Sequence, residues 1–134
     1  MKIMKKITLI FGLVLLLTAC PMDYEHGFNV KNNSNQTILV TGGYILPDTL
    51  LPEKPNKLIT VNVGKRYYVY GSLVGDDDLD QLYYANKILT LFILSKNSVD
   101  SYSWEYIREN NIILKRYEFD SQELEMMNRT ITYP

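Results

Sequence analysis

The chain has 134 residues, with 14 basic and 15 acidic side chains and a formal net charge of −1. A chain of this length can bury one hydrophobic core but has no room for a second domain of ordinary size. It contains no block of Lys or Arg that could neutralise a phosphate backbone, so nucleic acid is excluded as a partner.

The first nineteen residues have the pattern of a secretory signal peptide. Lys2, Lys5 and Lys6 form a positive segment, and an uncharged apolar run follows over 7–17. That run is too short to span a bilayer as a helix, which needs about 20 residues, but it suits a signal peptide. We expect residues 1–19 to be removed. Because three basic side chains leave with them, the remaining chain would carry 11 basic and 15 acidic side chains, a net charge of −4.

Residues 17–20, Leu-Thr-Ala-Cys, match the lipobox of bacterial lipoproteins. The Cys20 sulfur, the only thiol in the chain, would accept diacylglycerol, and cleavage before Cys20 would free an amine for further acylation. Two or three acyl chains anchor a protein stably. We therefore expect a lipidated tether over 20–27 and a single globular domain over 28–134. Pro21 stands where inner-membrane lipoproteins commonly have aspartate, which favours an outer-membrane location.

Short strands dominate the first half of the expected domain. Alternating apolar residues predict half-buried strands, and clusters of Asn, Ser and Pro predict the connections. The proline-containing segment 45–57 is expected to be a loop or an edge excursion. Gly64-Lys65 predicts a tight hairpin turn. The expected strands lie over 28–32, 36–44, 58–63 and 66–73.

The second half combines strands with two short helices. The almost wholly apolar run 88–94 predicts a strand buried on both faces. Residues 99–109 predict a helix, and Asp120 with Glu123 has the form of a capping box that starts a second helix, through Met127. Further strands are expected over 112–119 and 130–133. About seven short strands predict a mainly β, antiparallel two-sheet sandwich, with an α+β fold as the alternative.

Several stretches of the chain are familiar: WEYI at 104–107, LKRYEF at 114–119 and NRTITYP at 128–134. Together with the lipobox and a Pro-Asp-Thr segment at 47–49, they resemble small lipoproteins of Bacteroides-type bacteria. We know of no activity for that family. The resemblance therefore implies a shared fold and an envelope location, without a chemistry.

An acidic loop places Asp76, Asp78 and Asp80 at alternate positions, as calcium loops do. An EF-hand needs Gly at its sixth position and Glu at its twelfth. Those positions hold Gln81 and Lys87, so a solvated loop is the favoured interpretation. Calcium binding in another geometry is the alternative.

Clustered tyrosines suggest an aromatic platform for sugar rings or for a protein partner. The alternative is a strand that faces solvent on one side, where tyrosine is also common. Trp104, and Tyr67 within the same run, could add to the platform. The residues proposed to form it are Tyr68, Tyr70, Tyr83 and Tyr84.

Asp48-Thr49-Leu50 fits the Asp-Thr/Ser-aliphatic pattern on which Bacteroides-type bacteria attach O-glycans. A three-residue pattern often occurs by chance. Its place in a proline-rich loop, which we expect to be exposed, makes Thr49 a candidate for O-glycosylation.

No residue pattern indicates an enzyme. His26 is the only histidine, so neither a His-based triad nor a multi-His metal site can be assembled. Glu105 and Glu109 would share one helix face, where carboxylates are normally surface charges. We expect no catalysis and no cofactor.

The sequence favours a lipid-anchored, non-enzymatic interaction or structural module of the cell envelope, with an envelope protein as partner. The alternative is a carbohydrate-binding lipoprotein that serves glycan uptake. An exposed row of aromatic rings in a groove would favour sugar, and a flat apolar patch would favour a protein partner.

Overall fold

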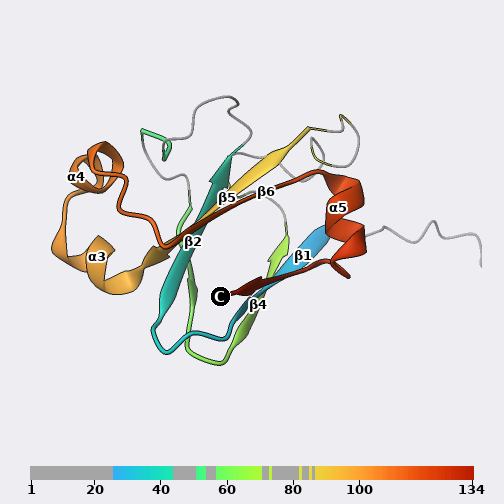
Figure 1. The fold of residues 1–134 in the computed structure, drawn as a ribbon, viewed down its shortest axis with the longest axis horizontal. Coiled ribbons are helices and arrows are strands. Elements are labelled where there is room, and N and C mark those ends of the chain that lie inside the picture. The colour runs from blue at the N-terminus through green and yellow to red at the C-terminus, as the bar shows by residue number, and fades with distance from the viewer. Residues whose placement is uncertain are drawn as a thin grey trace, which may run out of the picture.

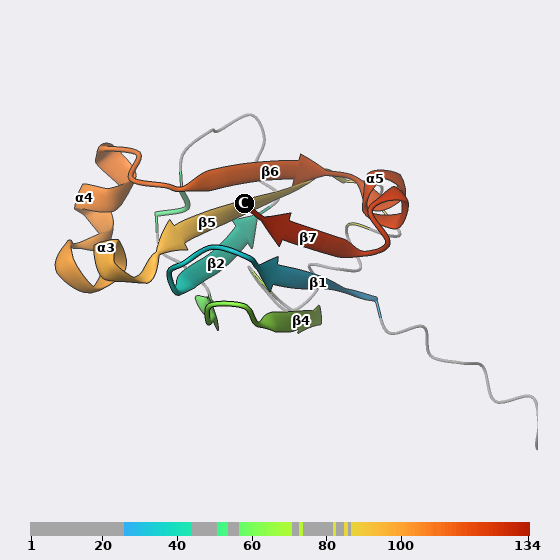
Figure 2. The same ribbon diagram turned by 60° about the horizontal axis from the view of Figure 1, so that its bottom comes forward.

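The structure is a computed structural model, and it describes residues 26–43, 51–53, 57–70, 73, 82, 85 and 87–134. Within these residues, seven strands form two sheets, and three short helices lie in the C-terminal half (Figures 1 and 2). The expectation of a mainly β, two-sheet architecture is confirmed.

The two sheets contain three and four strands. The three-stranded sheet has the order β4 (Arg66–Tyr70), β1 (Gly27–Asn32) and β7 (Thr130–Tyr133). The four-stranded sheet has the order β3 (Ile59–Val61), β2 (Ile38–Gly43), β5 (Leu89–Ser95) and β6 (Lys115–Phe119). The helices are α3 (Lys96–Ser101), α4 (Trp104–Glu109) and α5 (Ser121–Met126).

One strand pair departs from the expected antiparallel arrangement. β1 pairs with β7 in parallel, with Val30 opposite Ile131, whereas every other strand pair of the described residues is antiparallel. A parallel pair needs a crossover rather than a hairpin. Here α5 carries the chain from β6 in one sheet to β7 in the other (Figure 2).

The prediction of a hairpin at Gly64-Lys65 is wrong. The turn itself exists, because the Lys65 N–H donates to the Asn62 carbonyl over 3.0 Å and Gly64 has a φ of +67°. However, β3 and β4 belong to different sheets. The Gly64 N–H donates to the Asn32 carbonyl, and the Asn32 N–H donates to the Lys65 carbonyl, each over 2.9 Å. The turn therefore bonds to the end of β1 and leads from one sheet to the other.

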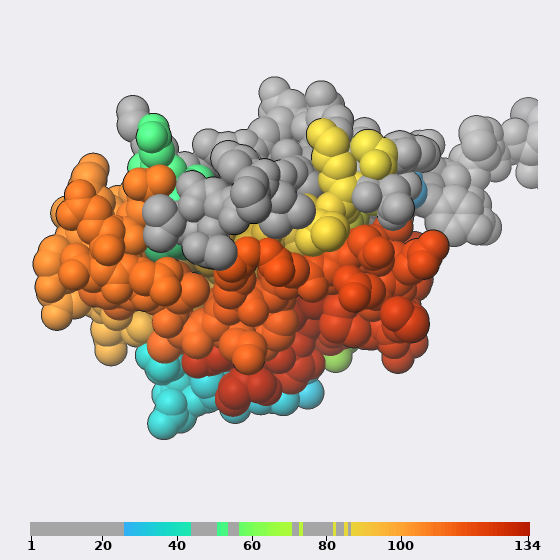
Figure 3. All heavy atoms as spheres, turned by 45° about the horizontal axis from the view of Figure 1, so that its top comes forward, coloured from blue at the N-terminus to red at the C-terminus, as the bar shows by residue number. Residues whose placement is uncertain are grey.

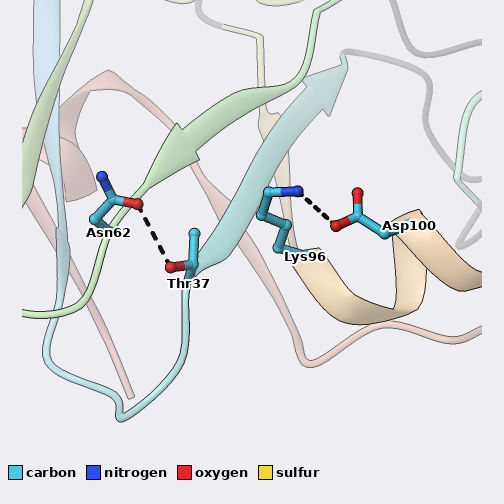
Figure 4. A network of polar contacts seen from close by, with 4 residues as sticks. All are labelled: Thr37, Asn62, Lys96 and Asp100. Carbon is cyan, nitrogen blue, oxygen red and sulfur yellow. Dashed lines mark hydrogen bonds and ion pairs between the residues drawn. The ribbon is translucent and has the colours of Figure 1, made fainter.

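The fully buried side chain of Asn32 links two of the connections between the sheets, the one from β1 to β2 and the one from β3 to β4. Its Nδ2 donates to the Gln36 carbonyl over 2.8 Å and to the Val61 carbonyl over 2.9 Å. Its Oδ1 accepts hydrogen bonds from the backbone N–H and the hydroxyl of Ser34. Nearby, the Thr37 hydroxyl donates to Asn62 Oδ1 over 3.4 Å (Figure 4).

The main core lies between the sheets. Alternate residues of each strand face inward, as the pleat requires. Phe28 and Phe119 meet edge to face, with ring centroids 5.6 Å apart. The remaining members come from both sheets, from α5 and from two single positions between β4 and β5: Val30, Ile38, Val40, Ile59, Val61, Val69, Leu73, Leu82, Leu89, Leu91, Ile93, Leu124 and Ile131.

A second apolar cluster covers the outer face of the four-stranded sheet. Phe92 and Leu94 of β5 pack there with Leu39, Leu51 and Ile107. Leu91 and Ile93 of the same strand face the main core. All seven residues of β5 are buried. The prediction of a strand buried on both faces is therefore confirmed.

The helix expected over 99–109 is in fact two helices. Ser103 separates α3 from α4 because its backbone is extended and its hydroxyl oxygen accepts the Tyr106 N–H over 3.2 Å, which makes it the N-cap of α4. The predicted capping box of α5 is confirmed: Asp120 Oδ1 accepts the Glu123 N–H over 2.8 Å, and Glu123 Oε2 accepts the Asp120 N–H over 3.1 Å.

The helices lie at opposite ends of the sandwich. α3 and α4 lie at one end, and α5 lies at the other, beside the start of β1 (Figures 1 and 2). In the space-filling view, the orange atoms of α3 and α4 form the surface at one end, and the red atoms of the α5 region lie toward the other (Figure 3). Surfaces on α3–α4 and at the start of β1 are therefore separated by the length of the strands.

Candidate functional site

The outer face of the three-stranded sheet carries an exposed pair of tyrosines on β4. Tyr68 and Tyr70 flank the inward-facing Val69, so the pleat places both rings on the same outer face. The ring centroids are 6.1 Å apart and the ring planes differ by 23°. The two residues are 37% and 67% exposed. Tyr68 lies over Gly27, where a Cβ atom would meet its hydroxyl and would lie 2.7 Å from the Val69 carbonyl oxygen.

Polar and cationic residues fill the rest of this sheet face. Lys31 lies opposite Arg66 in the β1–β4 register, and Asn29 lies between Tyr68 and Thr130. No outward position of these three strands is a carboxylate. We call this surface the tyrosine face; it consists of Gly27, Asn29, Lys31, Arg66, Tyr68, Tyr70, Thr130 and Thr132.

A second tyrosine pair lies at the α3–α4 end. Tyr102 ends α3 and Tyr106 lies in α4. Their ring centroids are 5.0 Å apart with the planes 26° from parallel, and the side chains are 50% and 47% exposed. The Ser103 cap fixes the start of α4, and Asn110 Nδ2 donates to the Tyr106 carbonyl over 2.9 Å. The end of α3 and the start of α4 therefore set the position of this pair.

The segment 51–53 holds α4 in place. Trp104 Nε1 donates to the Pro52 carbonyl over 2.8 Å, and Arg108 Nε donates to the Leu51 carbonyl over 2.7 Å. Ile107 is fully buried in the second apolar cluster with Leu51. Tyr106 thus projects from a helix whose opposite side is packed and hydrogen-bonded, and Tyr102 stacks on it from the end of α3, so little ordering would be needed on binding.

The structure brings together only part of the platform that the sequence predicts. Tyr68 and Tyr70 lie side by side, whereas Trp104 is half-buried in the second apolar cluster at the α3–α4 end. Tyr102 and Tyr106 were missed, although their spacing of four residues inside an expected helix was a usable signal. The other predicted site residues lie outside the described residues: Cys20, Thr49, Asp76, Asp78, Asp80, Tyr83 and Tyr84.

Tyr117 on β6 is a titratable group whose pKa is shifted by its surroundings. Burial raises the pKa of its hydroxyl, and the neighbouring Tyr133 raises it further. The hydroxyl donates to the Thr132 carbonyl over 3.0 Å, which links β6 in one sheet to β7 in the other. The raised pKa keeps this hydroxyl protonated, and so able to donate, to a higher pH than that of an ordinary tyrosine.

Three buried polar atoms surround Phe92 on the outer face of the four-stranded sheet. Phe92 lies between Thr41 and Arg116 in the register, and Thr90 lies two residues earlier on the same side of β5. The hydroxyls of Thr41 and Thr90 and the Nε of Arg116 make no hydrogen bond to the described residues. Each such group costs about 1–3 kcal/mol when it is buried without a partner.

The described residues hold no cluster of three or more His, Cys, Asp or Glu that could bind a metal ion. Over the same residues, no helix is long and apolar enough to cross a membrane.

Comparison of the chain with protein-family models, with curated proteins and with solved structures finds no match.

Proposed function

We propose that the chain is a lipid-anchored, non-enzymatic interaction module of the bacterial cell envelope, held at the outer membrane through Cys20. The stacked pair of Tyr102 and Tyr106 is the observation that carries the interaction role. The basic segment, the apolar run and the lipobox over 2–20 support the anchor. The resemblance to small lipoproteins of Bacteroides-type bacteria supports the envelope location.

Exposed aromatic pairs are typical of contact surfaces for protein partners. Tyrosine supplies a large apolar area with few rotatable bonds and keeps a hydroxyl for hydrogen bonding. The two rings are half-exposed: Tyr106 lies on α4, which is held by Leu51 and Pro52, and Tyr102 stacks on it from the end of α3. Such a preorganised pair is suited to act as the centre of a small interface.

A carbohydrate ligand is the second candidate function. The exposed polar side chains of Ser101, Glu105 and Asn110 flank the two rings along the chain. Sugars combine apolar ring faces with hydroxyl groups, so a ligand of this class would use both the rings and their polar neighbours.

The anchor is tested by metabolic labelling with a palmitate analogue. We expect the full chain to incorporate the label and Cys20→Ser to remain unlabelled, because the sulfur is the acceptor. Cell fractionation should find wild type with the outer membrane and the variant elsewhere. Equal labelling of the two chains would contradict the anchor.

The interaction role is tested by a photo-crosslinking amino acid at position 106 of the full chain in cells. Position 126 is the matched control, because Met126 is 76% exposed but lies on α5 at the other end of the sandwich. We expect a discrete conjugate from position 106, lost on Tyr102→Ala, and none from position 126. The same conjugates from both positions, or none from either, would contradict a specific partner at this end.

Affinity electrophoresis in gels that contain bacterial polysaccharides distinguishes the two candidates. Retardation of the wild type but not of a Tyr102→Ala, Tyr106→Ala variant would favour the carbohydrate ligand. Met126→Ala is the control for a nonspecific effect of removing an exposed apolar side chain, since Met126 is 76% exposed and lies on α5, outside both tyrosine pairs.

A further inference from the structure

The place where β1 begins limits how far the tyrosine face can lie from the proposed anchor. Gly27, the first residue of β1, follows Cys20 by seven residues. An extended chain spans at most about 3.6 Å per residue, so the start of β1 lies within about 25 Å of the lipidated sulfur. Gly27 lies directly opposite Tyr70 in the β1–β4 register. A lipid anchor at Cys20 would therefore let the exposed tyrosines reach the bilayer.

The charge of the tyrosine face differs from that of the chain as a whole. Lys31 and Arg66 lie opposite each other on this face, and neither forms an ion pair with a residue that the structure describes. The outward positions include no carboxylate, although the chain beyond residue 19 carries four more acidic than basic side chains. A cationic patch on an acidic domain is complementary to an anionic surface.

We propose that the tyrosine face rests on the headgroup layer of the bilayer that holds the Cys20 lipid, an inference that depends on the proposed anchor. Tyrosine is enriched at membrane–water interfaces, where its ring lies among the headgroups and its hydroxyl remains in water. Lys31 and Arg66 then face phospholipid phosphates. The face adds a protein contact to the acyl chains and fixes which side of the domain points at the membrane.

This orientation leaves the other tyrosine pair free for a partner. α4 packs through Ile107 into the second apolar cluster, on the outer face of the four-stranded sheet. The tyrosine face is the outer face of the three-stranded sheet, so both sheets separate the two tyrosine pairs. α3 and α4 also lie at the end away from the start of β1 (Figures 1 and 2).

Fluorescence quenching by lipids tests the orientation. The full chain, produced and acylated in a bacterium, carries either Thr132→Cys on the tyrosine face or Ser101→Cys at the α3–α4 end, and each thiol is labelled with a fluorophore. The probe membrane is a vesicle of phosphatidylethanolamine and phosphatidylglycerol whose acyl chains are brominated close to the headgroup. We expect the label at position 132 to lose fluorescence and the label at position 101 to keep it.

Further variants test which side chains hold the face on the membrane. Tyr68→Ala with Tyr70→Ala, and separately Lys31→Glu with Arg66→Glu, should restore the fluorescence at position 132. Lys115→Glu, on β6 of the other sheet, is the control and should change nothing. Thermal melts confirm that each variant is folded. If the Lys31→Glu, Arg66→Glu variant does not fold, the chain labelled at position 132 is measured instead on phosphatidylcholine vesicles, which remove the anionic charge of the membrane without changing the protein.

The outcomes separate this inference from the anchor. The parent chain without an introduced cysteine should not react with the thiol reagent, because the Cys20 sulfur carries lipid. A reactive parent would overturn the anchor and this inference with it. An unreactive parent with equal quenching at positions 132 and 101 would overturn the tyrosine face alone. If a soluble anionic polysaccharide protects the thiol at position 132 from the labelling reagent, and vesicles do not quench the label there, the tyrosine face would be assigned to a glycan instead.

Discussion

Replacement of Asn32 by alanine tests what holds the connections from β1 to β2 and from β3 to β4. The side chain is fully buried and makes four hydrogen bonds. Two of them satisfy the backbone carbonyls of Gln36, which precedes β2, and of Val61, which ends β3. The other two hold Ser34 in the connection between β1 and β2. Alanine would remove all four bonds and leave a void.

The magnitude follows from these bonds. A typical hydrogen bond contributes about 1 kcal/mol net, and a buried group that loses its partner costs about 1–3 kcal/mol. The Val61 carbonyl is buried at this contact, while the Gln36 and Ser34 groups are partly buried and can recover some hydration. We expect Asn32→Ala to lower the free energy of unfolding by about 3–5 kcal/mol, a loss far above that of a surface substitution.

Urea denaturation of residues 21–134, followed by circular dichroism, measures this loss. Asn35→Ala is the matched control, because Asn35 is an exposed asparagine in the same connection, and it should change stability by less than about 0.5 kcal/mol. If Asn32→Ala costs less than about 1 kcal/mol, the four hydrogen bonds do not hold the connections and the reasoning is refuted.

Asn32→Asp supplies a second measurement with a definite sign. Its carboxylate would face the carbonyl oxygens of Gln36 and Val61, so the pKa of the new group would be raised in the folded state. The protonated form, which can donate one hydrogen bond, is then favoured by folding. Stability relative to wild type should therefore increase as the pH falls through the raised folded pKa toward the unfolded value of about 3.9. A deficit that does not change with pH would contradict this.

Three further predictions concern the sheets. Phe92→Ala should cost about 3–5 kcal/mol through the cavity left in the second apolar cluster, whereas Ile88→Ala, at a 41% exposed position, should cost less than about 1 kcal/mol; thermal melts compare them. Thr41→Val should raise stability by about 1 kcal/mol because it removes a buried hydroxyl without a described partner. Thr60→Val, at an exposed position, is the control and should not raise stability. A loss of stability in Thr41→Val would mean that the Thr41 hydroxyl is hydrogen-bonded in solution. Tyr117→Phe should cost about 0.5–1.5 kcal/mol at neutral pH through the lost hydrogen bond. Since the pKa of Tyr117 is raised above 10.0 in the folded state, the wild type should lose its advantage over this variant as the pH rises above 10.0, which alkaline urea titrations would show.

Local patterns in the sequence predicted most strands and the start of one helix correctly. The alternation over 58–63 and the apolar run 88–94 identify β3 and β5 because the side-chain period of a strand is two, whatever it packs against. Asp120 and Glu123 identify the start of α5 because a capping box involves only four consecutive residues. Ser103 shows the limit of such reasoning. Its capping role splits the helix expected over 99–109, although apolar spacing alone favours one helix.

The candidate contact surfaces were less predictable from the sequence than the strands and the helix start, because they depend on the fold. Tyr68 and Tyr70 share a face through the strand period, so the sequence predicted their proximity. The sequence also grouped Trp104 with them, but the structure places it in the second apolar cluster against Pro52. Tyr102 stacks on Tyr106 although the helix breaks at Ser103 between them, a break that the apolar spacing did not predict.

The sequence by itself determined where the backbone extends, coils and turns, because φ and ψ preferences, side-chain alternation and caps are properties of neighbouring residues. Tertiary structure alone decided which strands pair. Gly64 reverses the chain in either case, but β4 pairs with β1 and not with β3. That choice depends on contacts between residues far apart in the chain, such as the bond from Asn32 to Val61 and the parallel pairing of β1 with β7. Those contacts form only when both sheets close over one core, so no short window of sequence contains them.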